Sequence, residues 1–245
     1  MTTAFGIVIA AEAESDARRI KSLVDAILVA EIEWLAEQPE QARDNLLDDL
    51  RKWRSFDSAS SFLDIHKIHD FADARGLPSP RGHFDGRPAA QDYHSALRAL
   101  WLLIAEGRPP ALIWVRDTDG QIARIKGWTD ACSEAGADFP VLIGGFPHEC
   151  MEAWLLVAHS VDRRKPEFAQ MCQRLGFNPL EHPERLSHKD HAPKSAKRVC
   201  KALGVSDERW LDANPEDLAQ RGAGCGLAEF IGGIRDELVP AVKRP

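Results

Sequence analysis

The sequence contains no apolar run approaching the roughly 18 residues that a membrane-spanning helix needs. It also lacks a basic segment ahead of its first apolar stretch, residues 5–11, and acidic residues follow that stretch at once. The stretch is too short for the apolar part of a signal peptide. The sequence therefore predicts neither a membrane span nor a signal peptide, and we expect a cytoplasmic protein.

Paired cysteines are absent as well. The chain has five cysteines, and none of them forms a Cys-x-x-Cys pair. An odd and dispersed set of cysteines argues against a disulfide framework and against a structural zinc site. We expect most of these thiols to be buried as small apolar side chains.

An excess of positive charge, the usual mark of a nucleic-acid-binding protein, is missing from the chain as a whole, because the net charge is −7. The charge is uneven, however. Residues 185–201 contain six Lys or Arg and one acid, a local charge of +5, so the remainder sums to −12. An anionic substrate would be attracted to this basic segment.

Three short apolar runs rich in β-branched residues predict buried strands at residues 5–11, 111–115 and 139–143. Amphipathic helices alternate with them; the helix after the first strand has an apolar face at Ile20, Leu23, Val24, Ile27 and Leu28. This alternation predicts an α/β fold with a mostly parallel central sheet flanked by helices.

The rest of the chain is predicted to be helical. We expect a domain over residues 1–162 that carries a helical insertion at residues 38–90, ending in a loop. Within the insertion, apolar spacing predicts one helix that includes Leu46 and Trp53 and another that includes Phe62 and Ala72. Residues 163–245 are expected to form a helical C-terminal region packed on the same domain.

Two acidic turns follow the first two of these strands. The first is Glu12-x-x-x-Asp16 and the second is Asp117-x-Asp119. Parallel α/β sheets hold their sites at the carboxyl ends of the strands, so neighbouring strands would bring four carboxylates together. Close carboxylates repel unless a cation lies between them, and oxygen ligands suit Mg²⁺ or Mn²⁺. The alternative is two ordinary solvated turns that favour helix N-termini.

A third acidic group follows the third strand. We expect a helix from about residue 148 to 160, in which Glu149 and Glu152 lie on one face at i and i+3. One of the two could complete the set of metal ligands. Acids that simply favour a helix N-terminus are the equally weighted alternative.

The order of these motifs resembles the Toprim-like superfamily, including OLD-type nucleases and small nucleases of anti-phage defence systems. The resemblance rests on Glu12, on Asp117-x-Asp119 and on the Glu-Ala-Trp-Leu-Leu sequence at residues 152–156. It implies that Glu12 is a general acid or base and a metal ligand. It also implies that Asp117 and Asp119 hold Mg²⁺ and that Asp16 and Glu152 are further acids of the site. Ala13 departs from the glycine that usually follows the glutamate in that family.

The resemblance implies a metal-dependent nuclease acting on DNA or RNA. We expect the substrate phosphates to contact Arg116, beside the acidic turn. We also expect them to contact Lys194, Lys197 and Arg198, which helical spacing places on one face together with Lys201. A solvated helix face is the alternative. His188 and His191, three residues apart, are more typical of surface or supporting groups than of a metal pair.

Other functions remain open. A Toprim-like domain can be a catalytically silent binding module regulated by a partner ATPase, and a homo-oligomer is compatible with the sequence. Asp117-x-Asp119-Gly120 after a strand also resembles the nucleophile motif of HAD-type phosphohydrolases, although a later acidic pair is missing. A manganese-dependent nucleotide-sugar transferase could use the same two aspartates.

Overall fold

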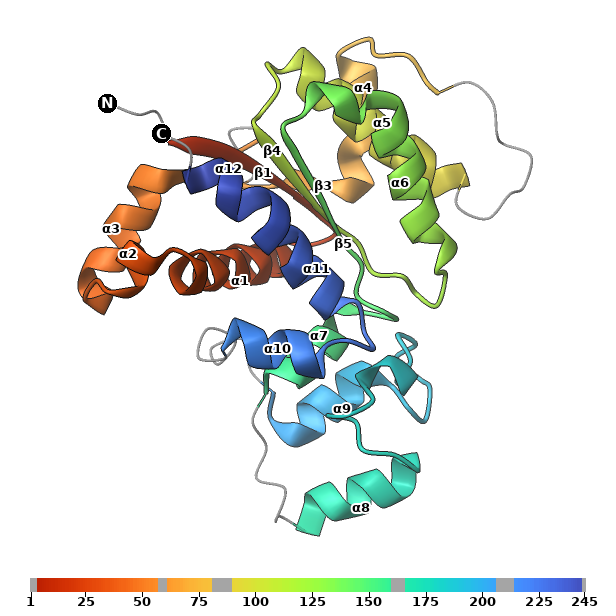
Figure 1. The fold of residues 1–245 in the computed structure, drawn as a ribbon. Helices are drawn as coiled ribbons and strands as arrows, with labels where there is room; N and C mark the ends of the chain where they lie inside the picture. Colours follow the sequence, from red (N-terminus) through yellow and green to blue (C-terminus); the bar gives the residue numbers. More distant parts are fainter. Residues whose placement is uncertain (1–3, 57–60, 81–89, 160–165, 206–213, 244–245) are drawn as a thin grey trace.

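A five-stranded parallel sheet forms the centre of the fold, with helices on both of its faces (Figure 1). The computed structural model describes residues 4–56, 61–80, 90–159, 166–205 and 214–243. The strand order is β2-β1-β4-β5, and β3 pairs with β1 beside β2. The strands are β1 (Phe5–Ala11), β2 (Arg51–Trp53), β3 (Leu63–Asp64), β4 (Ala111–Val115) and β5 (Val141–Gly145). The predicted α/β class and parallel sheet are confirmed.

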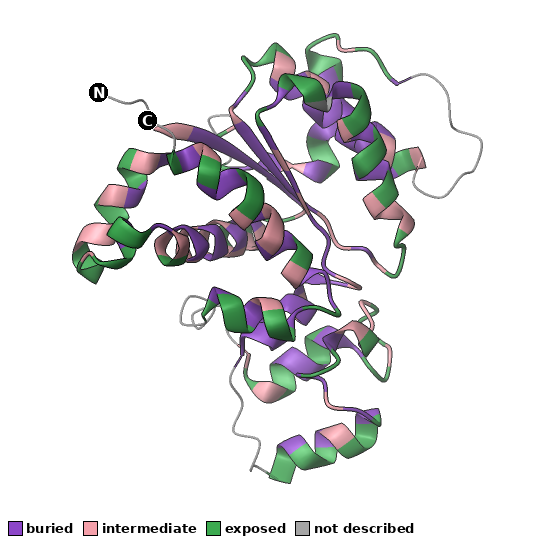
Figure 2. Ribbon diagram, in the orientation of Figure 1, coloured by how far each residue is buried: buried purple, intermediate pink, exposed green. Residues whose placement is uncertain are grey.

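Strands β1 and β4 are buried on both faces, which explains their continuous apolar sequences. Side chains of β1 alternate between two cores: Ile7 and Ile9 belong to one, Val8 and Ala10 to the other. One face of the sheet is covered by α1 (Glu14–Glu31), α11 (Leu227–Gly233), the π-helical turn η5 (Ile234–Leu238) and α12 (Val239–Lys243). The other face is covered by α4 (Ile68–Ala74), α5 (Ala90–Ala105) and α6 (Ala123–Ala135). Figure 2 shows the buried residues concentrated between these layers.

The segment expected to be a helical insertion is only partly helical, and it contributes to the sheet. Helix α3 (Glu40–Leu50) ends before Trp53, which lies in β2 instead of in the predicted helix. Phe62 precedes β3 and the 3₁₀ turn η1 (Ile65–Lys67), so the next helix is α4 alone. Strands of two or three residues are too short to show an alternating pattern. The apolar spacing that predicted the helices therefore included the residues of these strands. The loop predicted to end the insertion is seen in part, because residues 77–80 form neither helix nor strand. Residues 57–60 and 81–89, with the remainder of that loop, lie outside the described residues.

The described residues after 165 are mostly helical and fall into two groups. Helices α8 (Pro166–Leu175) and α9 (Ala196–Leu203), with η3 (Pro183–Arg185), enclose their own apolar cluster against α7 (Met151–Ala158). Helix α10 (Pro215–Arg221) and the helices after it join the main core, where Arg235 Nε lies 2.6 Å from Glu31 Oε1 on α1. Within the described residues, no helix is both long enough and apolar enough to cross a bilayer.

Candidate metal and phosphate-binding site

The two predicted acidic turns meet because β1 and β4 are neighbouring parallel strands. Ala10 pairs with Trp114, so Glu12 and Asp117 follow the ends of their strands at the same edge of the sheet. Strand β3 pairs with the end of β1 and brings the η1 turn, with His66, to this edge too. The predicted convergence at the carboxyl ends is therefore present in the structure.

Asp117 lies at the centre of the acidic cluster. Its pKa is raised from 3.8 to about 8, first by burial and then by the negative charges of Glu12, Asp16, Glu152 and Asp119. These four carboxylates lie close enough to act on Asp117, so the structure brings together five of the six acids that the sequence singled out, all but Glu149. Asp117 retains a proton near neutral pH unless a positive charge joins the cluster.

Glu12 occupies a more balanced environment. Burial raises its pKa most, Asp119 adds to the rise, and the charges of Arg116, His66 and Arg124 offset part of it. Its carboxylate lies 3.6 Å from Arg116 Nε. A carboxylate with a raised pKa is better suited to exchange a proton near neutral pH than an ordinary glutamate.

Two arginines and one aspartate form a largely buried ion cluster beside the acids. Arg116 Nη1 lies 2.7 Å from Asp92 Oδ1, and Arg124 Nε lies 3.6 Å from the same oxygen. The three side chains are only 11–12% exposed. The angles do not satisfy hydrogen bonding, so Arg116 Nε and Nη1 and Arg124 Nε have no hydrogen-bond acceptor among the described residues. These N–H groups are buried, so they could bind the oxygens of a phosphate only if the ion cluster opened.

The turn after β4 has a fixed shape. Asp119 and Gly120 both have left-handed backbone angles, with φ of 47° and 73°. Arg124 Nη1 donates to the Asp117 carbonyl at 2.6 Å and to Asp119 Oδ2 at 2.8 Å. Thr118 is fully buried, and its hydroxyl accepts a hydrogen bond from the Glu149 backbone N–H at 2.8 Å. The turn is therefore held both by α6, through Arg124, and by the segment after β5.

Glu149 does not share a helix face with Glu152, and that prediction was wrong. Helix α7 begins at Met151, after an extended Cys150, and Glu149 has a left-handed φ of 68°. The backbone N–H of Asp119 donates to the Glu149 carbonyl at 3.0 Å, which holds residue 149 outside the helix. Only Glu152 joins the acids around Asp117.

The Glu149 side chain instead contacts His188. Its Oε2 lies 2.8 Å from His188 Nδ1 and 3.3 Å from the His188 backbone nitrogen. This double contact joins the loop before α9 to the acidic turn. A carboxylate at Nδ1 orients an imidazole and favours the tautomer with its proton there, so His188 is a supporting group in this structure.

The basic helix α9 begins at Ala196, later than the spacing of Lys194, Lys197, Arg198 and Lys201 predicted. Ser195 is its N-cap and accepts a hydrogen bond from the Arg198 N–H, so Lys194 precedes the helix and is not on its face. Lys194 Nζ lies 5.1 Å from the centre of the Phe177 ring. The pKa of Lys197 is raised by a hydrogen bond to Asp190 and further by the charge of Glu152. Lys197 is therefore the α9 lysine that is electrostatically linked to the acidic cluster.

The donor chemistry of the cluster fits a hard divalent cation, because every acid offers oxygen and the pKa of Asp117 is raised by burial and, in addition, by four neighbouring negative charges. As the side chains stand, no group of three His, Cys, Asp or Glu within the described part of the chain is arranged to hold a metal ion. Arg116 and Arg124 lie against Glu12 and Asp119 instead. Metal binding would therefore require these carboxylates to turn away from the arginines.

Sequence reasoning missed two residues of the site, Asp92 and Arg124. Arg124 lies five residues after Asp119, so a search for a cation within five residues of the acidic turn would have found it. Asp92 reaches the site from a distant segment, α5, and no local pattern marks it. His188, which its spacing from His191 predicted to be a surface or supporting group, contacts Glu149 from the loop before α9.

Comparison of the chain with models of protein families, with curated proteins and with solved structures finds no match.

Proposed function

We propose that this chain is a divalent-metal-dependent nuclease of the Toprim-like type, which hydrolyses phosphodiester bonds in DNA or RNA. The observation that carries the proposal is the cluster of Glu12, Asp16, Asp119 and Glu152 around Asp117, whose pKa is raised to about 8. Such a cluster is stabilised by a cation, and it lies at the edge where parallel α/β sheets hold their sites.

Asp117 and Asp119 would hold Mg²⁺ or Mn²⁺, together with Glu12 and with support from Asp16 and Glu152. When bound, the metal would supply an activated water and would neutralise charge on the phosphate. Binding replaces the proton on Asp117, so the affinity for metal increases with pH.

The side chains of the protein then have separate tasks. Glu12, with its raised pKa, is suited to accept the proton of the attacking water. The unsatisfied N–H groups of Arg116 and Arg124 could bind the nonbridging phosphate oxygens once the ion cluster opened. Asp92 lies between both guanidinium groups and positions them.

Helix α9 offers a second place for the anionic substrate. Lys197, Arg198 and Lys201 are exposed, and Lys197 is close enough to Glu152 to respond to its charge. Contacts from this helix to flanking phosphates would position the substrate without selecting a sequence.

The first test is thermal unfolding with and without millimolar Mg²⁺ or Mn²⁺. A ligand that binds only the folded state raises its stability, so wild type should show a metal-dependent rise in Tm. The rise should be absent in Asp117→Asn/Asp119→Asn and should persist in Asp44→Asn, which changes an exposed carboxylate on α3.

The second test is cleavage of single- and double-stranded DNA and RNA by the same proteins. We expect metal-dependent cleavage that Glu12→Gln lowers at least 100-fold, a typical contribution of a general acid or base. Metal binding without cleavage of any of these substrates would instead support the silent binding module. An aspartyl-phosphate on Asp117 would support the HAD-type reaction.

A further inference from the structure

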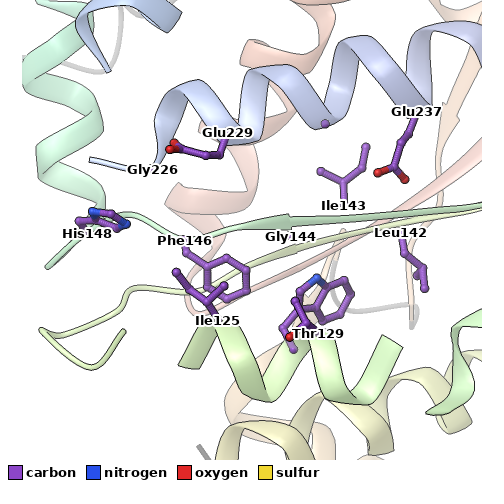
Figure 3. A pocket seen from close by; sticks show the side chains of 12 residues that line it. Ile125, Thr129, Leu142, Ile143, Gly144, Phe146, His148, Gly226, Glu229 and Glu237 are labelled. Atoms are coloured by element: carbon purple, nitrogen blue, oxygen red, sulfur yellow. The ribbon is translucent and has the colours of Figure 1, made fainter. Parts of the chain in front are cut away.

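A cavity of 370 Å³ lies at the outer edge of the sheet, away from the acidic cluster (Figure 3). Helix α6 lines it on one side with Trp128, and α11 and η5 line it on the other with Glu229 and Glu237. Between them runs strand β5, with Leu142 and Gly144 exposed to the cavity. The cavity is a slot that follows an edge strand between two helices.

The edge of β5 has backbone groups that no neighbouring strand uses. Val141 N–H and Gly145 C=O bond toward β4, with distances of 3.2 Å to Pro110 O and 3.0 Å to Arg116 N. Backbone groups alternate in direction along a strand, so those of Leu142 and Gly144 point outward. No other strand of the described chain pairs with this edge. Such an edge is a template for an added strand.

Glu237 protects one of these outward groups, because its carboxylate accepts a hydrogen bond from the Leu142 N–H. A charged side chain placed in this way discourages indiscriminate pairing of an edge. An added strand would replace the carboxylate at Leu142 and leave Glu237 free to bind a positive charge.

The two carboxylates lie toward opposite ends of the slot (Figure 3). Eight residues separate Glu229 from Glu237, which is about 12 Å along a helix. Two residues four apart on one face of an extended strand are separated by about 13 Å. The carboxylates therefore match basic side chains at positions i and i+4 of an added strand.

The α6 side of the slot suits the alternate positions of such a strand. Trp128 packs against β5 because Gly144 has no side chain; an added Cβ would lie 2.6 Å from the indole nitrogen. Ile125 also lines this wall. Side chains at i+1 and i+3 would therefore meet an apolar surface.

We propose that the edge of β5 binds an extended segment of a partner protein that carries Lys or Arg at positions i and i+4, with apolar residues at i+1 and i+3. The charge of the slot favours this occupant over a second copy of the chain, whose net charge is −7 and whose paired slot would bring like carboxylates together. This site is independent of the acidic cluster and of the proposed nuclease function.

The test uses the full-length, ¹⁵N-labelled chain and the capped peptide Lys-Val-Thr-Val-Lys. Binding should shift the Gly144 amide signal and slow its hydrogen exchange, because a strand added at this edge pairs with that group. A peptide of the same composition in the order Lys-Lys-Val-Thr-Val should bind at least about 5-fold more weakly, since only one of its charges reaches a carboxylate.

Matched variants separate the slot from general charge attraction. Glu229→Gln and Glu237→Gln should each weaken binding roughly 5-fold, and Asp236→Asn, an exposed acid outside the slot, should not. Gly233→Leu should fill the slot and abolish binding. Gly232→Leu adds the same side chain where no atom lies within 4 Å of the new Cβ, and it should leave binding intact.

Several results would overturn the proposal: no binding of the first peptide at millimolar concentration, equal binding of both peptides, or an unchanged Gly144 amide at saturation. A concentration-dependent dimer that protects Gly144 without peptide would show that the edge pairs with a second copy. Each of these outcomes leaves the nuclease proposal standing.

Discussion

Arg124 holds Asp119 through an ion pair of 2.8 Å between Nη1 and Oδ2, so a guanidinium occupies one of the carboxylates proposed to bind metal. The same nitrogen donates to the Asp117 carbonyl at 2.6 Å. A cation cannot use that oxygen of Asp119 until Arg124 moves, and the charge of Arg124 repels the cation as well. In the proposed nuclease, Arg124 would therefore serve substrate binding at the expense of metal affinity.

Replacement of Arg124 by Gln should separate these two roles. We expect Mg²⁺ to bind roughly 3- to 10-fold more tightly, the range expected for removal of one partly exposed neighbouring charge. Cleavage should nevertheless fall, because a phosphate contact is lost. Titration calorimetry measures the first effect and the cleavage rate the second. Lys126→Gln, which removes an exposed cation on the same helix, is the control and should change neither.

Asp117 should make stability depend on pH. Its pKa in the folded chain is about 8, above its ordinary value of 3.8, so between these values the folded state binds more protons than the unfolded state. The free energy of unfolding must then decrease as pH rises from about 4 to 8. An unscreened pKa shift changes the free energy of unfolding by ~1.4 kcal/mol per pKa unit. Asp117 is partly exposed and solvent screens its charge, so we expect a smaller total loss, on the order of 2 kcal/mol.

Urea unfolding of wild type and Asp117→Asn in EDTA, at pH 5 and pH 8, tests this expectation. Asparagine cannot ionise, so the variant should lose less stability between the two values and should be the more stable protein at pH 8. Equal losses in both proteins would show that Asp117 titrates normally and would remove the main support for the metal site.

Glu12 and Asp117 could be predicted from the sequence because each lies within two residues of the end of an apolar strand. Strand direction and the parallel arrangement then bring Glu12 and Asp117 to one edge without further information. The counter-charges could not be predicted in this way. Asp92 lies in the first turn of α5, and its contact with Arg116 depends on how that helix packs against the sheet.

The failed predictions have local causes. Helical spacing placed Glu149 in α7, but its backbone is held in a left-handed conformation by hydrogen bonds to the Asp117–Gly120 turn. Strands β2 and β3 gave no signal of their own because they contain only three and two residues. In each case a contact with a distant segment decided the conformation, and a pattern of neighbouring residues does not record such contacts.

Asp92 should be more important for folding than an ordinary acid. Its removal in Asp92→Ala leaves Arg116 and Arg124, each 12% exposed, without their shared counter-charge. Breaking a buried ion pair from one side typically destabilises a protein by about 3–5 kcal/mol, and we expect about 3 kcal/mol here because the cluster is not fully buried. Urea unfolding measures the change. Asp130→Ala removes an acid that is 49% exposed and paired with Lys126, and it should change stability by less than about 0.5 kcal/mol.

Gly120 should tolerate no side chain, for two separable reasons. Its φ is +73°, which an L-residue adopts at a cost of about 1 kcal/mol, and an added Cβ would lie 2.9 Å from Glu149 Oε1. Gly76 has a similar φ of +66° with no atom within 4 Å, so Gly76→Ala isolates the backbone contribution. We expect thermal or urea unfolding to show a loss of stability of about 1 kcal/mol for Gly76→Ala and about 2 kcal/mol or more for Gly120→Ala.

The difference between the two losses should disappear when both substitutions are made in the Glu149→Ala variant, because the crowding atom is then gone. A difference that persists in that background would mean that the turn itself, and not its contact with Glu149, requires glycine.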